Sequence, residues 1–408
     1  MVQSRRDWAD LGFLVLLALV LVKPAAGTAV NHWLGLTACL AAALMALAVL
    51  RRRPPGFWYR RYRTPLWLLG GLALSYLGST ALHFTSYPSL LELGFRALGP
   101  LAVISLFPLL WLILDHGGGD RRLRWLVLGV LLVIEGLGAL QPFAPQWVDP
   151  IRRHTVAADA LPVITSLYRW HTILGTLSAL IALYGMIRFF RVGGRWRLFY
   201  AVMAGIALLA GALSRSRNFL LSLLVGLGGW LLVSRQRLLL GAGVLVACLL
   251  LFHVVAWFNP KVSARYATAL PYLQKLHRPA TLTAKDFLPR VDDRSLSGRL
   301  RIWSRAVELW RRSPWFGLGP GVFSLESGFG RVHNTHNIFL QSLVDAGVPG
   351  LVFVAGFWVW ALRRTFGTAA FPLTLAALAA LCFDDFLDKS MAWVLVTTWL
   401  IHDLVHEG

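Results

Sequence analysis

The sequence predicts an all-α membrane protein with about twelve transmembrane helices. Of its 408 residues, 57% are hydrophobic, 14% are charged and 18 are tryptophan. Apolar runs of helix length recur along the chain, and arginine clusters separate many of them. Because a soluble domain carries roughly 25% charged residues, this composition indicates a chain that crosses a bilayer many times.

The apolar runs define the expected transmembrane helices, since about 20 apolar residues in a helix span the hydrocarbon core. Lys23-Pro24 follows the first run without a small-residue cleavage site, so we expect a retained helix and no cleaved signal peptide. The expected organisation is helices 1–9 in residues 1–258, a loop domain in 259–336 and helices 10–12 in 337–408. The runs lie near residues 9–27, 29–50, 65–85, 91–114, 125–144, 171–190, 198–214, 219–234, 238–258, 337–362, 368–384 and 391–405.

Arginine clusters between the runs predict the orientation of the helices. If each run crosses once, the clusters fall on one side, which the positive-inside rule assigns to the cytoplasm together with both termini. These orientation signals supply nearly half of the basic residues behind the net charge of +21, so we expect no nucleic-acid binding. The clusters comprise Arg5, Arg6, Arg51, Arg52, Arg53, Arg60, Arg61, Arg63, Arg121, Arg122, Arg124, Arg188, Arg191, Arg195, Arg197, Arg235, Arg237, Arg363 and Arg364.

The three cysteines all lie within apolar runs, at Cys39, Cys248 and Cys382. Cysteines placed in this way are packing residues. We therefore expect neither disulfides nor a cysteine metal site.

Two arginines break the orientation rule, because Arg215 and Arg217 fall in a short outer loop where topology does not require them. The segment 259–336 also carries an outward excess of positive charge. We expect Arg217 in the first turn of the eighth span, where the helix N-terminus also favours an anion. An anchoring role at the lipid headgroups is the alternative for a boundary arginine, and it stays open here.

The segment DDRSLSGRLRIWSRAVELWRRSP predicts an amphipathic helix near the outer surface, bounded by a serine-rich start and a Ser-Pro stop. The following WFGLGPGVF is glycine-rich, which is typical of either a simple turn or a close backbone approach to a substrate. The apolar stripe of the helix recurs at spacings of three and four, at Leu300, Trp303, Val307 and Trp310.

A polar cluster, RVHNTHN, precedes the apolar run of the tenth span. Since that run begins near Asn337, His336 is expected at the outer N-terminal end of a helix, which disfavours an imidazolium and keeps the ring neutral. A neutral imidazole can take a proton when an oriented partner fixes its other nitrogen. A structural, hydrogen-bonded histidine is the alternative at such a boundary.

Four motifs in residues 200–350 form a recognisable series. HNIFLQSLVDAG carries His336, Asn337, nine residues and then Gly347, whereas the same count from His333-Asn334 reaches Val344. The others are SRSRNFLLSLL with Arg217, SLSGRLRIW with Arg299, and SPWFGLGPGVF. In order and spacing, these motifs resemble those of the O-antigen ligase family of bacterial inner-membrane glycosyltransferases, whose fold class also contains O-antigen polymerases and O-linking protein oligosaccharyltransferases.

The resemblance implies a GT-C-like membrane fold with a periplasmic active site, acting in lipopolysaccharide biosynthesis. A glycan on undecaprenyl diphosphate would pass to a hydroxyl of the lipid A-core acceptor, with inversion, in contact with membrane lipids. In this interpretation His336 is the base. The diphosphate would be held through charge-assisted hydrogen bonds by Arg217, Arg299 and Arg215. The supporting residues would be Asn337, Gly347 and Trp303.

We expect neither a metal ion nor another cofactor in this transfer, because arginines can stabilise the departing diphosphate. The outer acids that might hold a cation are equally explained as helix caps or solvated loop residues. Three of them flank the last outer loop, where an acceptor might be oriented. The acids in question are Asp292, Asp293, Asp384, Asp385 and Asp388.

Two ionisable residues fall inside expected spans, where such groups are costly. Arg96 has Glu92 four residues earlier on the same helix face, so a structural pair is expected. The role of Glu135 stays open.

Four alternatives to an O-antigen ligase remain. A polymerase or an O-linking oligosaccharyltransferase would use the same donor and differ in its acceptor. A transporter or flippase would carry internal repeats or charges along several spans, and no repeat is visible. A membrane-anchored assembly protein would use the outer loop to bind partners without chemistry.

Overall fold

The computed structural model describes residues 55–89, 100, 106–107, 110, 114–115, 121–141, 143–144, 171–214, 216–233, 299–329, 334–384 and 391–406. Every regular element within these residues is a helix, which confirms the all-α class for this part of the chain. The spans expected at 9–27, 29–50 and 238–258, most of the span expected at 91–114, and most of the loop domain lie outside it. The elements are α3 (Pro55–Leu82), η2 (Phe84–Ser86), α5 (Arg121–Leu140), α7 (His171–Arg191), α8 (Arg195–Leu213), α9 (Arg217–Val233), α13 (Arg299–Trp310), α14 (Val322–Glu326), α15 (Ile338–Thr365), α16 (Phe371–Leu381) and α17 (Met391–His406).

Several of these helices are suited to a bilayer. Within the described residues four are long and apolar enough to cross it, namely Tyr62–Leu82, Thr172–Arg191, Arg195–Leu213 and Ile338–Thr365. α9 and α16 are apolar but shorter. The chain is therefore a helical membrane protein, while the total of about twelve spans and the GT-C-like architecture stay predictions.

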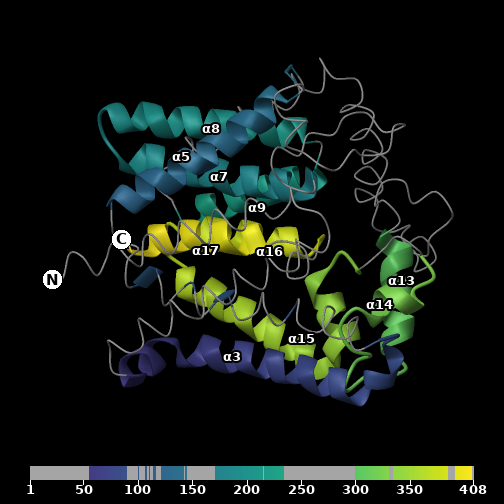
Figure 1. Cartoon of the computed structure of the whole chain (residues 1–408). Helices are drawn as coiled ribbons and strands as arrows, with labels where there is room; N and C mark the ends of the chain where they lie inside the picture. The colour runs from purple at the N-terminus through teal and green to yellow at the C-terminus, as the bar shows by residue number, and fades with distance from the viewer. Residues whose placement is uncertain are drawn as a thin grey trace, which may run out of the picture.

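The described helices form a bundle (Figure 1). α5, α7, α8 and α9 lie together on one side, α3 and α15 on the other, and α16 and α17 between them. Small residues permit the close approaches: Gly71 of α3 faces Phe353 of α15, and Gly185 of α7 faces the backbone of Tyr200 in α8. α13 and α14 lie at one end of the bundle, beside the start of α15 (Figure 1).

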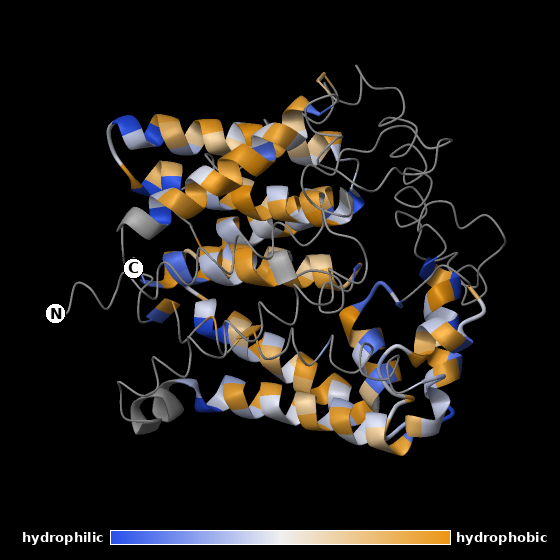
Figure 2. Ribbon diagram, viewed as in Figure 1, coloured by the Kyte–Doolittle hydropathy of each residue, from blue (hydrophilic) through white to orange (hydrophobic). Residues whose placement is uncertain are grey.

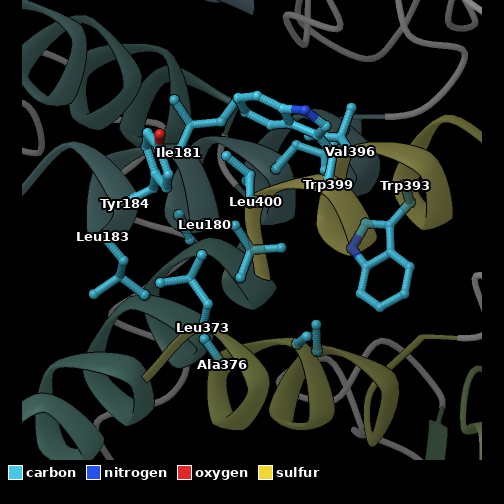
Figure 3. Packing of buried hydrophobic residues seen from close by; sticks show 14 of the residues in the cluster. Leu180, Ile181, Leu183, Tyr184, Leu373, Ala376, Trp393, Val396, Trp399 and Leu400 are labelled. Carbon is cyan, nitrogen blue, oxygen red and sulfur yellow. The ribbon is translucent and has the colours of Figure 1, made fainter. Parts of the chain in front are cut away.

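The centre of the bundle is formed by apolar side chains of α7, α16 and α17 (Figure 3). Leu180 and Leu373 are fully buried there, and the indole of Trp399 is 2% exposed. Because lipid chains are as apolar as leucine, such packing stabilises a membrane bundle through close van der Waals contact rather than through removal of apolar surface from water.

Arginines gather at one end of the bundle, which we call the arginine-rich end. There Asp403 of α17 accepts hydrogen bonds from Arg188 of α7, from Nε of Arg124 of α5 at 2.8 Å and from the Tyr184 hydroxyl at 2.7 Å. Figure 2 shows hydrophilic residues concentrated at the helix ends and apolar ones along the helices. The clustering agrees with the arginine pattern of the sequence, whose assignment to the cytoplasm stays a prediction.

Helix α15 is broken near its start, at Gly347, where φ is 69° and ψ is −161°. The glycine-rich loop lies against this break: Leu318 N donates to Val344 O at 2.7 Å, and Gly319 N donates to Asp345 O at 3.0 Å. A Cβ on Gly347 would lie 2.3 Å from the carbonyl oxygen of Trp315. The backbone of the loop does approach another segment closely, but that segment is α15, and the expected approach to a substrate stays a prediction.

Candidate functional site

The opposite end of the bundle, which we call the His336 end, carries most of the residues singled out by the sequence. The helix expected there is confirmed as α13, but its buried stripe is offset from the predicted one. Ile302, Ala306 and Leu309 are buried, whereas the predicted stripe is only half-buried, at Leu300, Trp303, Val307 and Trp310. The tryptophans lie on the flank of the helix because an indole can cover apolar surface while its N–H reaches a polar partner.

Trp303 connects α13 to the segment before α15. Its Nε1 donates to the backbone oxygen of Thr335 at 2.9 Å, and its ring centroid lies 6.0 Å from that of Phe383, just after α16. Thr335 is fully buried, and its N–H donates to Oε1 of Gln341 at 2.9 Å. These contacts hold Trp303 beside the residue that precedes His336, and its supporting role in the site stays a prediction.

His336, which precedes α15, contacts Asp384, which follows α16. Its Nδ1 lies 3.2 Å from Oδ1 of Asp384, whose side chain is 2% exposed while that of His336 is 30% exposed. The backbone of His336 has φ 54°, the one positive φ among the described non-glycine residues. A left-handed non-glycine residue costs about 1–2 kcal/mol, and such strain concentrates at functional sites.

Asn337 holds this arrangement in place as the N-cap of α15. Its Oδ1 accepts from the N–H groups of Phe339 and Leu340 at 2.9 and 3.0 Å, and its Nδ2 donates to the backbone oxygen of Cys382 at 2.9 Å. One amide therefore caps α15 and ties it to the segment that carries Asp384. His336 lies one residue outside the cap, so the expected position at the helix N-terminus is confirmed.

Arg217 opens α9, which confirms its expected place in the first turn of that helix. α9 and α16 are antiparallel neighbours: Gly226 faces Ala376 and Gly229 faces Pro372. If this register continues to the His336 end, Arg217 lies level with the residues that follow α16, where Asp384 is found.

Arg299 opens α13, four residues before Trp303. Residues four apart share one helix face and lie about 6 Å apart along the axis. Arg299 is therefore one turn from the side chain that contacts Thr335. Arg217, Arg299 and His336 thus all begin or precede helices at the same end of the bundle.

The sequence does not reveal the partner of His336. Asp384 is predicted only as a residue that might orient an acceptor, because nothing in the motif spacing pairs it with a histidine 48 residues away. Glu135 is fully buried and accepts from the Ser178 hydroxyl at 2.6 Å, far from these residues in the chain. The predicted residues that lie outside the described part of the chain are Arg96, Arg215, Asp292, Asp293, His333, Asp385 and Asp388.

The arrangement has the parts of a general-base site. An imidazole whose one nitrogen faces a buried carboxylate is fixed in orientation, and its second nitrogen can take a proton. Two guanidinium groups, each at a helix N-terminus at this end of the bundle, favour an anionic ligand through both their own charge and the helix dipoles. Such a site is suited to moving a proton beside a phosphorylated group.

Part of the chain is similar to a known protein family. The family model described as O-antigen ligase matches residues 202–355. Among curated proteins, none matches the chain. The matched segment begins in α8 and includes α9, α13, the polar cluster at His336 and the broken first part of α15. In this segment, which is less than half of the chain, the protein is similar to the O-antigen ligase family.

Proposed function

We propose that this protein is an O-antigen ligase of the bacterial inner membrane. It transfers a glycan from undecaprenyl diphosphate to a hydroxyl of the lipid A-core oligosaccharide, at a site on the periplasmic face. The observation that carries the proposal is the contact between His336 and Asp384. It forms at the end of the bundle where α9 begins with Arg217 and α13 begins with Arg299. The family match supports it, because the matched segment contains Arg217, Arg299 and His336, although it ends before Asp384.

The proposed reaction is a direct displacement at the anomeric carbon. The acceptor oxygen forms the new glycosidic bond, its proton passes to Nε2 of His336, and the bond from the anomeric carbon to the diphosphate oxygen breaks. Asp384 accepts the hydrogen on Nδ1, so it stabilises the imidazolium that forms. A single displacement inverts the configuration of the transferred sugar.

The arginines stabilise the leaving group in this mechanism. Negative charge grows on the diphosphate as its bond to the sugar breaks, and the guanidinium groups of Arg217 and Arg299 compensate that charge with forked hydrogen bonds. Arg215 precedes Arg217 by two residues and is assigned to the same anion site. No step of this mechanism uses a metal ion.

Reconstitution tests the proposal. Purified protein in liposomes receives a labelled glycan on undecaprenyl diphosphate, together with either lipid A-core or an excess of the donor alone. A ligase produces labelled lipid A-core and does not lengthen the glycan on the donor. A polymerase lengthens the donor glycan even without lipid A-core. Absence of both products, with a folded protein and intact donor, would overturn the proposal.

Variants connect the activity to the site. We expect His336→Ala to lower transfer by about 10²–10⁴-fold while leaving protein level and folding unchanged. The matched control is His83→Ala, since His83 also lies at this end but contacts Ser313 at 3.4 Å and not Asp384. Full transfer by the His336→Ala protein would remove the base from the mechanism.

A further inference from the structure

Two histidines and an aspartate converge at the arginine-rich end, away from His336. His402 and His406 lie one helical turn apart at the end of α17. Nε2 of His402 is 3.0 Å from Oδ1 of Asp115, and Nε2 of His406 is 3.3 Å from the same oxygen. The three ligand atoms all lie within 4.8 Å of one another.

We propose that Asp115, His402 and His406 bind a divalent transition-metal ion of the Zn²⁺ class. Imidazole nitrogen and carboxylate oxygen together are the donors that Zn²⁺ and its neighbours in the first transition row prefer. Two histidines at positions i and i+4 present their rings on one helix face, and a carboxylate from another segment completes three protein ligands. The site is separate from the proposed glycan transfer, which uses no metal.

The distances between donor atoms fit a common ion. Ligands held about 2.0–2.2 Å from Zn²⁺ are roughly 3.3 Å apart in a tetrahedron and roughly 3.0 Å apart at adjacent corners of an octahedron. The two nitrogen–oxygen distances of 3.0 and 3.3 Å lie in this range. The rings of His402 and His406 are stacked at 4.0 Å with 23° between their planes, so the rings must rotate about χ2 for both lone pairs to point at one ion.

The hydrogen bonds around the cluster resemble the support found behind metal ligands. Nδ1 of His406 lies 3.0 Å from the backbone oxygen of His402, and a carbonyl oxygen can only accept, so this nitrogen carries hydrogen. A neutral His406 ring then turns the lone pair of Nε2 toward a carboxylate oxygen, which is repulsive unless a cation lies between them. The Tyr62 hydroxyl of α3 donates to the other oxygen of Asp115, which orients the carboxylate.

The cation between these groups is either a metal ion or a proton. With a proton, His406 is an imidazolium paired with Asp115, and the stack joins a charged ring to a neutral one. With a metal ion both rings stay neutral, and each donor has a ligand role. Metal content therefore separates the two cases.

The surroundings leave room for further ligands on the ion. A pocket of about 110 Å³ lies beside the cluster, lined by Tyr62 of α3, Arg364 and Thr365 of α15, and both histidines of α17. The side chain of His406 is 37% exposed, so water can reach the site. A bound ion would join α17 to Asp115 and, through Tyr62, to α3, which makes its role structural.

Metal binding by the full chain tests the proposal. The protein is purified in detergent without a polyhistidine tag, stripped with a chelator and titrated with Zn²⁺, and bound metal is measured by mass spectrometry. We expect about one ion per chain, a melting temperature that rises with Zn²⁺, and visible absorption bands when Co²⁺ replaces Zn²⁺. His406→Gln should weaken binding by more than about 100-fold, and Tyr62→Phe by about 10–100-fold.

Two controls keep the result interpretable. His83→Gln removes a histidine at the opposite end and should leave Zn²⁺ binding unchanged. His406→Gln is the main variant, because replacing this partly exposed side chain should not disturb folding. Size-exclusion chromatography verifies the fold. Asp115→Asn and His402→Gln repeat the test. Equal Zn²⁺ binding by wild-type and His406→Gln proteins, or no binding by the folded wild type, would overturn the proposal and leave a proton between His406 and Asp115.

Discussion

Nδ1 of His336 lies 3.2 Å from Oδ1 of Asp384, although 48 residues separate them in the chain. The contact requires the N-terminal end of α15 and the C-terminal end of α16 to lie side by side. Asn337 secures this by capping the first helix and bonding the backbone that follows the second. The pair is therefore a product of helix packing rather than of local sequence.

Asp384→Asn should lower glycan transfer by about 10²-fold or more. The amide preserves size and hydrogen bonding, but it carries no charge to stabilise a protonated His336. Initial rates at saturating donor and acceptor measure the effect, with Glu326→Gln as a control on the exposed surface of the same end. If the Asp384→Asn protein transfers at the wild-type rate, the negative charge of Asp384 is not needed to stabilise a protonated His336.

Arg217→Lys and Arg299→Lys should each reduce transfer by about 10²–10³-fold, even though the positive charge remains. An ammonium group cannot form the forked pair of hydrogen bonds that a guanidinium makes to a diphosphate. The loss is expected mainly in kcat, because the contact strengthens as the diphosphate leaves. Arg312→Lys, on an exposed side chain of the same end, should transfer normally; an equal loss there would point to a general charge effect instead.

Asn337→Ala should destabilise the protein by about 1–2 kcal/mol, since the cap of α15 is lost. Asn337→Asp keeps the acceptor oxygens for the cap and loses the hydrogen bond to Cys382. It should therefore melt near the wild-type temperature and still transfer more slowly, because the link between His336 and Asp384 is looser. Thermal unfolding and transfer rates measured on both variants separate the capping of α15 from the hydrogen bond to Cys382. If the two variants behave identically, the two roles are not separate.

Gly347→Ala should lower the melting temperature far more than Gly367→Ala. Both glycines have positive φ, of 69° and 78°, so alanine is strained at each by about 1–2 kcal/mol. Only at Gly347 would the added Cβ also meet the backbone of Trp315, whereas the space around Gly367 is open. Tryptophan fluorescence during heating measures both; equal shifts would mean that the loop moves aside at no cost.

Sequence patterns predicted the long helices well and the site contacts poorly. The span expected at 171–190 is α7, His171–Arg191, because a continuous apolar run defines a transmembrane helix almost by itself. The break at Gly347 was not predicted, since its cause is the backbone of a loop that approaches from outside the helix. The buried stripe of α13 was misassigned because the tryptophans were counted as core, although each indole N–H reaches a backbone oxygen.

The break at Gly347 separates the direction of the first part of α15 from that of the rest of the helix. An unbroken helix of 28 residues would be about 42 Å long. The direction of its first turns would then be fixed by the rest of the helix. Here the short outer piece ends at Gly347 and is hydrogen-bonded to the glycine loop instead. Replacements in the glycine loop can therefore shift the first part of α15 while the rest of the helix bundle keeps its packing.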